Sequence, residues 1–295
     1  MGASIVSPIF PPKLANHLAE SVREARHRYR KRLARCQKKF SEKAVHNLRT
    51  ETRRILALLS LIDGFHIKKS PKKLCKTFKK RLDAFDDLRD THVQRVLLKP
   101  MWPAFPEAKD FNKHLCKCEK RLEGQMSRKI KKTKHGSLNR RLKELEKCLC
   151  KCAEHPPNGR SGAVAQEVLG NAFRRVMVLR RQIKRNDPST IHHMRVAFKK
   201  FRYTAELLQP FSPKFTEERL ARIKNFQSTA GDIQDVAVLL KRLNKDIEDG
   251  CLEPACIDTL RGELVKRERL AIDSFMKRIN DLMDFEPEPP APLVL

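Results

Sequence analysis

The sequence predicts an all-α protein that consists of two pseudo-symmetric antiparallel helical bundles produced by an internal duplication. Apolar residues recur every three or four positions along nearly the whole chain, and no segment is a convincing strand. The 295 residues include only 10 glycines, which argues against a loop-rich or multi-turn β architecture. Short connections between successive long helices favour antiparallel packing. The duplication is predicted from a pair of motifs that occur twice in the same order.

The first bundle is predicted over about residues 13–154, after an N-terminal tail of residues 1–12. Its first helix is indicated by an apolar stripe that starts at Leu14 and reaches Phe40. Glycine, proline and serine punctuate the segments that follow. The further helices are expected at about 43–63, 70–98, 106–134 and 138–153.

A linker at about 155–162 divides the chain near its middle, because its two prolines and two glycines cannot continue a helix. The second bundle is predicted over about 163–284, and residues 285–295 form a proline-rich tail. The helices of this bundle are expected at about 163–185, 189–209, 214–248 and 254–284.

The composition is strongly basic, with 64 Lys and Arg against 35 Asp and Glu, which leaves a net charge of +29. No run approaches the roughly 18 apolar residues that span a bilayer, and the first residues do not resemble a secretory signal. We therefore expect a cytoplasmic protein with no membrane association. The nine cysteines are odd in number and include no C-x-x-C pair, so we expect reduced thiols that act as small hydrophobic side chains.

The internal repeat is the most informative feature of the sequence. Residues 45–62 align with residues 191–208, and a second segment downstream aligns at nearly the same offset. A self-match of this length indicates duplication. The aligned pairs are His46 with His192, Arg49 with Arg195, Arg53 with Lys199, Arg54 with Lys200, Asp87 with Asp232, and Asp90 with Asp235.

A helical projection places the repeated basic residues on one face of each helix, opposite an apolar face that includes Leu48 in the first copy and Met194 in the second. The alternative to a binding site is an ordinary solvated charged face, but the two basic rows lack alternating acids, each begins with a histidine, and the row occurs in both copies. The rows are His46, Arg49 and Arg53 in the first copy, and His192, Arg195, Lys199 and Arg202 in the second.

Acidic residues follow on the next helix of each copy, where Lys79 shares a face with Asp90 and Lys224 shares a face with Asp235. Fixed cations nearby would repel a metal ion, so we expect Asp90 and Asp235 to orient arginine side chains. Ordinary surface pairs remain the alternative for Asp83 and Asp86.

The repeated motif resembles that of the CHAD family, the conserved histidine α-helical domain, over about residues 13–284. The pattern H-x-x-R-[hydrophobic]-x-x-[RK]-[RK]-x-R-Y is matched by His192, Arg195, Val196, Lys199, Lys200, Arg202 and Tyr203. His46, Arg49, Arg53 and Arg54 match it in the first copy. The resemblance implies a basic surface or channel that binds inorganic polyphosphate, association with polyphosphate granules, and no established catalytic activity.

The first copy departs from this pattern. Thr50 replaces the usual aliphatic residue, Glu51 adds an acid, and Leu56 stands where a final arginine is expected. Phe85-Asp86 occupies the positions of Ala230-Gly231. These departures lie at the outer positions of the first copy, whereas its core cations His46, Arg49 and Arg53 match the pattern.

The chemistry of the residues agrees with polyphosphate, a polyanion without bases that is bound best by arginine and lysine on a stiff scaffold. We therefore predict non-catalytic polyphosphate binding without a cofactor or a metal. The predicted ligands are His46, Arg49, Arg53, Arg54, Lys79, His192, Arg195, Lys199, Lys200, Arg202 and Lys224, with Asp90 and Asp235 in support.

Three other functions remain open. A basic helical protein has the charge of a nucleic-acid binder, and non-specific contact with RNA is expected at low salt, but one Trp and two Tyr offer few stacking platforms. A phosphate-processing enzyme is not indicated, because a Walker loop and an E-x-E-x-K signature are missing and the basic rows supply no clustered carboxylates of their own to hold Mg²⁺. An adaptor for an acidic protein is the third possibility. The sequence leaves the oligomeric state and the preferred chain length undetermined.

Overall fold

The computed structural model describes residues 12–131, 135–154, 161–254 and 257–287. Within these ranges the chain is helical and contains no strand, which confirms the predicted all-α class. Residues 1–11 of the predicted N-terminal tail, 155–160 of the predicted linker and 288–295 of the proline-rich tail lie outside the described residues.

The helices of the first half follow the predicted order with one difference. The expected helix over 70–98 is two helices that are separated at Ala84 and Phe85. Phe85 is 5% exposed, and its amide bonds to Leu82, so the helix tightens and ends there. The elements are α1 (Pro12–Lys38), α2 (Glu42–Gly64), α3 (Lys72–Asp83), α4 (Asp86–Leu98), the short 3-10 helix η1 (Lys99–Met101), α5 (Glu107–Lys131) and α6 (His135–Glu154).

The second half has fewer and longer helices. Asp187 caps the helix Pro188–Leu208. Thr216 caps the helix Glu217–Glu248 by accepting a hydrogen bond from the Arg219 amide. The elements are α7 (Ser161–Arg181), α8 (Pro188–Leu208), η2 (Gln209–Phe211), α9 (Glu217–Glu248), α10 (Asp258–Arg278) and η4 (Ile279–Phe285).

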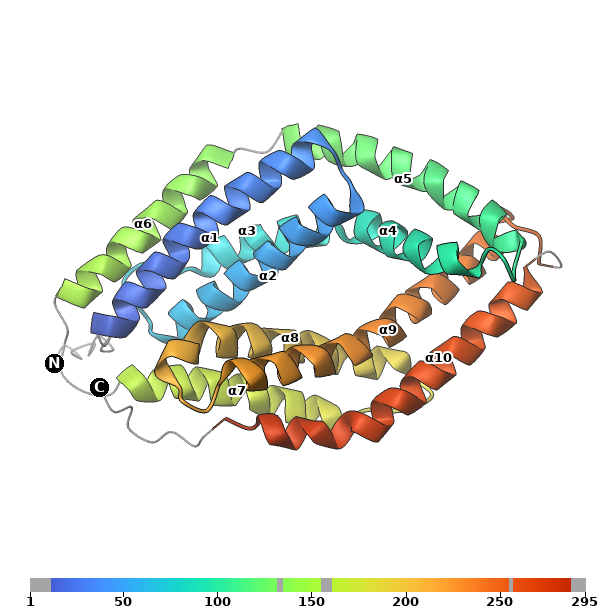
Figure 1. The fold of residues 1–295 in the computed structure, drawn as a ribbon. Helices are drawn as coiled ribbons and strands as arrows, with labels where there is room; N and C mark the ends of the chain where they lie inside the picture. Colours follow the sequence, from blue (N-terminus) through green and yellow to red (C-terminus); the bar gives the residue numbers. More distant parts are fainter. Residues whose placement is uncertain (1–11, 132–134, 155–160, 255–256, 288–295) are drawn as a thin grey trace, which may run out of the picture.

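The two halves lie side by side along their length (Figure 1). In the first half α2 packs between α1 and α3, α6 packs against α1, and α4 packs against α5. In the second half α8 packs between α7 and α9, and α9 packs against α10. The halves meet where α2 contacts α8 and where α4 contacts α9. The order of packing is similar in the two halves, while the internal duplication itself stays a prediction.

Two apolar cores join the halves at different places along the molecule. The larger core includes residues of both halves, such as Leu59 of α2 and Phe198 of α8. The smaller core lies where α4, η1 and α5 meet α9 and α10, and Leu115 and Leu239 are fully buried in it. Because each core spans both halves, burial of apolar surface holds the relative position of α2, α4, α8 and α9.

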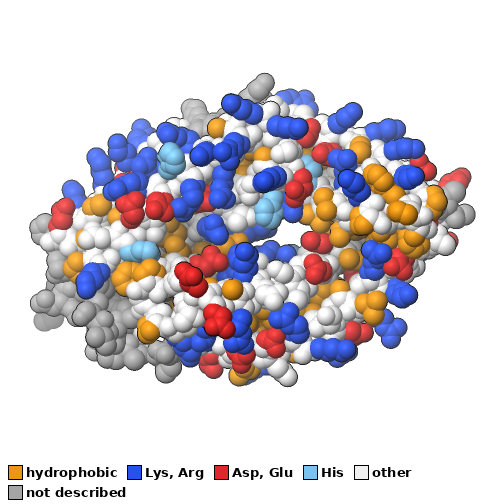
Figure 2. Space-filling view, in the orientation of Figure 1, with side chains coloured by type: hydrophobic (Ala, Val, Ile, Leu, Met, Phe, Trp, Pro, Cys, Tyr) orange, Lys and Arg blue, Asp and Glu red, His pale blue; other side chains and the backbone are white. Residues whose placement is uncertain are grey.

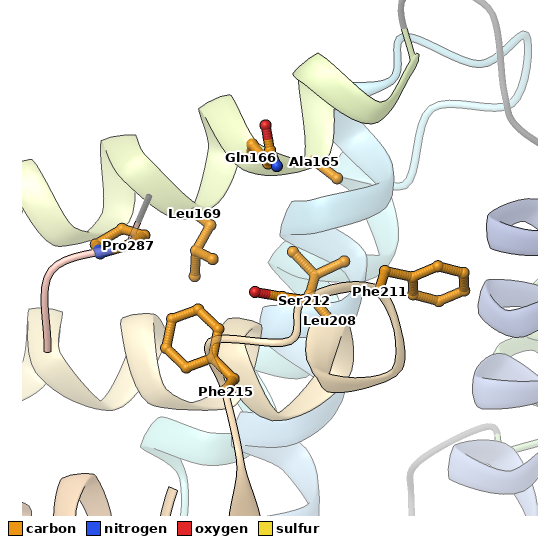
Figure 3. A pocket seen from close by; sticks show the side chains of 8 residues that line it. All are labelled: Ala165, Gln166, Leu169, Leu208, Phe211, Ser212, Phe215 and Pro287. Carbon is orange, nitrogen blue, oxygen red and sulfur yellow. The ribbon is translucent and has the colours of Figure 1, made fainter. Parts of the chain in front are cut away.

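A small cavity lies within the second half beside the larger core (Figure 3). Leu169 of α7, Leu208 of α8 and Phe215 point into it. Its volume is about 20 Å³, which is room for about one water molecule. It is therefore too small and too apolar to hold a polyanion.

None of the described helices combines the length and the apolar composition that a membrane crossing requires. The described cysteines are all free thiols, and Cys36 and Cys118 are buried.

Candidate functional site

The two helices that carry the repeated motif start from equivalent caps. Ser41 accepts a hydrogen bond from the amide of Ala44 at the start of α2, and Asp187 accepts one from the amide of Ser189 at the start of α8. Each cap lies five residues before the histidine of its motif. The caps therefore give both basic rows the same register relative to the start of the helix.

The apolar faces of these helices are buried, which turns the opposite faces toward the junction of the two halves. In α2 the buried face includes Leu48, Ile55 and Ile62, and in α8 it includes Met194 and Phe201. Close packing of these side chains restricts rotation of each helix about its axis. The positions of the cations are thus determined by the core.

Basic residues of both halves gather where α2 faces α8. The charges of Arg195 and Arg49 contribute to lowering the pKa of Arg53 to about 10, mainly because that guanidinium is desolvated by burial. Burial and the charges of Arg195, Arg53 and Arg49 lower the pKa of Lys199 to about 6. We call Arg49, Arg53, Arg195 and Lys199 the central cation cluster.

Few acidic side chains neutralise the positive charge of the central cation cluster. Among the described residues, Arg53, Arg195 and Lys199 form no ion pair with a carboxylate within 4.0 Å. Asp232 and Asp235 favour the charge of Arg195, but burial dominates and lowers its pKa. Unpaired cations held close together in a partly buried place repel one another, so the site is suited to an anion.

Arg49 differs from the other members of the cluster because its guanidinium is already engaged. It is 5% exposed, donates to the backbone oxygen of Leu82 at 2.7 Å and pairs with Asp86 at 2.6 Å. The Leu82 carbonyl at the end of α3 also accepts a hydrogen bond from the Phe85 amide, so Arg49 is its second donor. Arg49 thus stabilises the break between α3 and α4 as well as adding charge to the site.

The departure of the first copy at Asp86 has a structural consequence. In the second copy the corresponding residue is Gly231, and a Cβ atom there would lie 3.1 Å from a guanidinium nitrogen of Arg195. Glycine therefore lets Arg195 lie directly against α9 without an acid beside it. The first copy neutralises its arginine with Asp86, whereas the second copy leaves its arginine available.

Asp90 and Asp235 face each other across the junction of α4 and α9. Burial raises the pKa of Asp90 to about 6, and the charge of Asp235 contributes to that rise while Arg49 opposes it. Burial likewise raises the pKa of Asp235, opposed by Arg195. The charge of each arginine acts on the acid of its own half, but no ion pair within 4.0 Å joins Asp90 to Arg49 or Asp235 to Arg195 among the described residues, so the orienting role stays a prediction.

The two histidines lie at the start of the basic rows. His46 is exposed, and His192 is partly buried. Burial is the main cause of a lowered pKa in both, and neighbouring cations add to it: Arg89 for His46 and Arg195 for His192. Both imidazoles are therefore biased toward the neutral form in the free protein.

The other predicted ligands do not all join the cluster. Arg202 is 6% exposed, lies 4.4 Å from the ring centre of Tyr203 and pairs with Glu206 at 3.3 Å. Arg54 is exposed and lies 3.9 Å from Glu206. The remaining three predicted ligands are exposed and form no ion pair among the described residues; they are Lys79 on α3, Lys200 on α8 and Lys224 on α9.

Sequence reasoning missed two features near the site. Tyr203 was noted only as part of the motif, yet its buried ring lies against the guanidinium of Arg202 and its hydroxyl influences Arg53. Glu51 is fully buried on the other side of α2, where it pairs with Arg28 at 3.1 Å and Arg32 at 3.3 Å. The acid within the first motif therefore does not face the cluster.

The surface of the molecule extends this basic character (Figure 2). Lys and Arg side chains crowd the part of this face that the first half forms, and acids are mixed with them on the second half. A hollow lies near the middle of the face, where the two halves meet.

Comparison with known proteins agrees with the fold and the motif. The family model of the CHAD domain matches residues 21–244, which is more than half of the chain. The crystal structure of the CHAD domain from the plant Ricinus communis superposes with a TM-score of 0.69 at 15% sequence identity and covers 95% of each chain. No curated protein matches the sequence. The chain belongs to the CHAD domain family.

Proposed function

We propose that the chain binds inorganic polyphosphate at the central cation cluster and does so without catalysis. The observation that carries the proposal is the meeting of Arg53 from α2 with Arg195 and Lys199 from α8 in one partly buried site, where none of the three forms an ion pair within 4.0 Å among the described residues. A protein gains nothing in stability from cations that repel one another in a partly buried place. Their arrangement is explained by an anionic ligand that offsets the repulsion, and the CHAD family is linked to polyphosphate-related functions.

The contacts follow from the chemistry of the side chains. The guanidinium of Arg195 lies against α9 beside Gly231, and that of Arg53 reaches the same site from α2. Arginine can donate two parallel hydrogen bonds to phosphate oxygens, while Lys199 supplies a point charge. A chain of phosphates that passes between the halves engages both rows at once, and the second contact is then intramolecular.

Nucleic acid is the competing ligand, and the aromatic residues argue against a dedicated role of that kind. Proteins that bind single strands stack bases on exposed aromatic rings. The two tyrosines, Tyr29 and Tyr203, are 6% and 5% exposed. Charge recognition without base stacking favours polyphosphate, and on this basis we also propose an association with polyphosphate granules.

A competition experiment tests the ligand class. Labelled long-chain polyphosphate is bound to the full chain and displaced with duplex DNA, RNA or unlabelled polyphosphate of equal total charge. At near-physiological salt the Debye length is about 8 Å, so long-range attraction between the protein and the ligand is screened. Direct contacts between side chains and the ligand then determine the order of affinity. We expect polyphosphate to displace the label at the lowest concentration. Displacement by DNA or RNA at an equal or lower concentration would refute the proposal.

Asp86→Asn is expected to strengthen polyphosphate binding. The carboxylate of Asp86 pairs with Arg49, and its side chain is 49% exposed. Because the carboxylate end of this pair is exposed to solvent and screened, its effect is roughly 0.2–1 kcal/mol, so removing the negative charge should raise affinity by up to about fivefold. Asp83→Asn is the matched control, since Asp83 is exposed on α3 and forms no ion pair among the described residues. Equal gains from both variants would mean that only overall charge matters.

A further inference from the structure

A second group of polar side chains lies between α4 and α5, away from the central cation cluster. It consists of His92 on α4 with Glu119 and Glu123 on α5. One ligand atom from each residue lies within 4.8 Å of the others. The two glutamates are four residues apart and therefore share one face of α5, which is the face that meets α4.

The burial of His92 makes this group unusual. His92 is 3% exposed, and its Nδ1 has no hydrogen-bond partner among the described residues. Its Nε2 lies 3.2 Å from Oε1 of Glu119, without the geometry of a hydrogen bond, and is thus aimed into the group. Buried polar side-chain atoms are satisfied in the great majority of cases, so a buried imidazole that lacks a hydrogen bond and faces two carboxylates requires an explanation.

The surroundings hold the carboxylates in place. Arg95 pairs with Oε2 of Glu119 and also donates to the side-chain oxygen of Asn112 at 3.2 Å. The other oxygen of Glu119 remains directed at His92. An outer group that holds one oxygen of a carboxylate while the second binds an ion is a common arrangement in metal sites.

We propose that His92, Glu119 and Glu123 bind one divalent transition-metal ion of the zinc type. Imidazole and carboxylate together suit such ions, and three protein ligands leave a fourth position open for water. Two carboxylates and a neutral imidazole balance a charge of +2.

Nearby cations oppose an ion only weakly. The charge of Arg89 interacts with His92, but Arg89 is paired with Glu42. The charges of Lys39 and Arg95 interact with Glu123. The site is distinct from the polyphosphate site, because His92 and Asp90 are two residues apart on α4 and their side chains therefore point about 160° apart. A bound ion would fasten α4 to α5.

Metal titration of the full chain tests the proposal. Chelator-treated protein is titrated with Zn²⁺ against a chromophoric chelator, and its unfolding temperature is measured with and without the ion. We expect one Zn²⁺ per chain and a rise in the unfolding temperature. Because losing a group that merely supports a metal ligand costs 10–100-fold in affinity, Glu123→Gln or His92→Gln should weaken binding by about 100-fold or more and abolish that rise.

Two controls separate this site from other donors. Asp110→Asn removes an exposed acid of the same helix and should leave Zn²⁺ binding unchanged. Cys148→Ser with Cys152→Ser removes a pair of neighbouring thiols on α6 and should also leave it unchanged. Loss of the ion in the cysteine variant, or wild-type affinity in both Glu123→Gln and His92→Gln, would overturn the proposal.

Discussion

Replacing Arg53 and Arg195 together by alanine is expected to abolish tight polyphosphate binding. The two guanidiniums belong to different halves, and the charge of Arg195 contributes to lowering the pKa of Arg53, so we expect both to contact the proposed ligand. Hydrogen bonds to charged groups contribute about 1.5–3 kcal/mol each, and two of them correspond to roughly 10²–10⁴-fold in affinity. Isothermal titration calorimetry with long and short polyphosphate would measure this loss.

The control for this double variant removes the same amount of charge elsewhere. Lys79→Ala with Lys224→Ala changes one exposed cation on α3 and one on α9, both outside the central cation cluster. We expect a loss of only a few-fold, because exposed charges act through screened attraction (about 0.2–1 kcal/mol for a pair). Circular dichroism should show intact helices in both variants. Similar losses in the two variants would mean that binding is diffuse and that the repeated motif has a structural role.

Lys199→Met is expected to stabilise the free protein. The same variant should bind polyphosphate about tenfold or more weakly, because it loses one charge-assisted hydrogen bond to the ligand. Lys199 has a pKa of about 6, far below the ordinary 10.5, so the folded state disfavours its charge. At neutral pH the unfolded chain carries a proton on this amine that the folded protein disfavours, so removing the amine removes that cost of folding. Thermal unfolding and polyphosphate titration of the same variant would test both effects. Lys200→Met is the control, since Lys200 is exposed on the same helix.

The pH dependence of stability provides a second readout for Lys199. Above pH 10.5 the amine is neutral in both states and imposes no penalty on folding. As the pH falls toward about 6, the unfolded chain binds a proton that the folded protein does not, so stability is lost through this window. Lys199→Met should therefore show a smaller decrease in unfolding free energy between pH 10 and pH 6. An unchanged pH profile would contradict the proposed environment of Lys199.

Ligand binding should reverse this shift. A polyanion beside Lys199 favours the protonated amine, so we expect proton uptake on binding near neutral pH. The observed binding enthalpy of the wild-type protein should then depend on the ionisation enthalpy of the buffer, and that dependence should decrease in Lys199→Met.

The helices and their basic faces were predictable from the sequence because their signals are local. The period of apolar residues places Leu48 and Met194 in the core, and both are buried. The cations of the motif then fall on the opposite face of each helix. The break at Phe85 was missed, because it depends on the burial of that ring and on the distant donor Arg49, which donates to the Leu82 carbonyl.

The roles of individual cations could not be predicted because they depend on residues far apart in the chain. Arg49 and Arg195 occupy equivalent motif positions, yet Asp86 neutralises one and Gly231 exposes the other. Arg202 lies in the same basic row as Lys199, yet it stacks on Tyr203 and pairs with Glu206. Glu119 and Glu123 are four residues apart, but His92 lies on another helix, so only the packing of α4 against α5 brings the three side chains together.

The sequence by itself determined the all-α class, the charged face of each helix and membership in the CHAD family, since periodicity, composition and motif all reside in single segments. Only the tertiary structure decided that cations of both halves meet in one cluster. The physical reason is that two apolar cores hold α2 against α8 and α4 against α9, which forces like charges into a partly buried place and lowers the pKa of Lys199. That mutual repulsion is a property of distances between helices, and these distances are determined by packing.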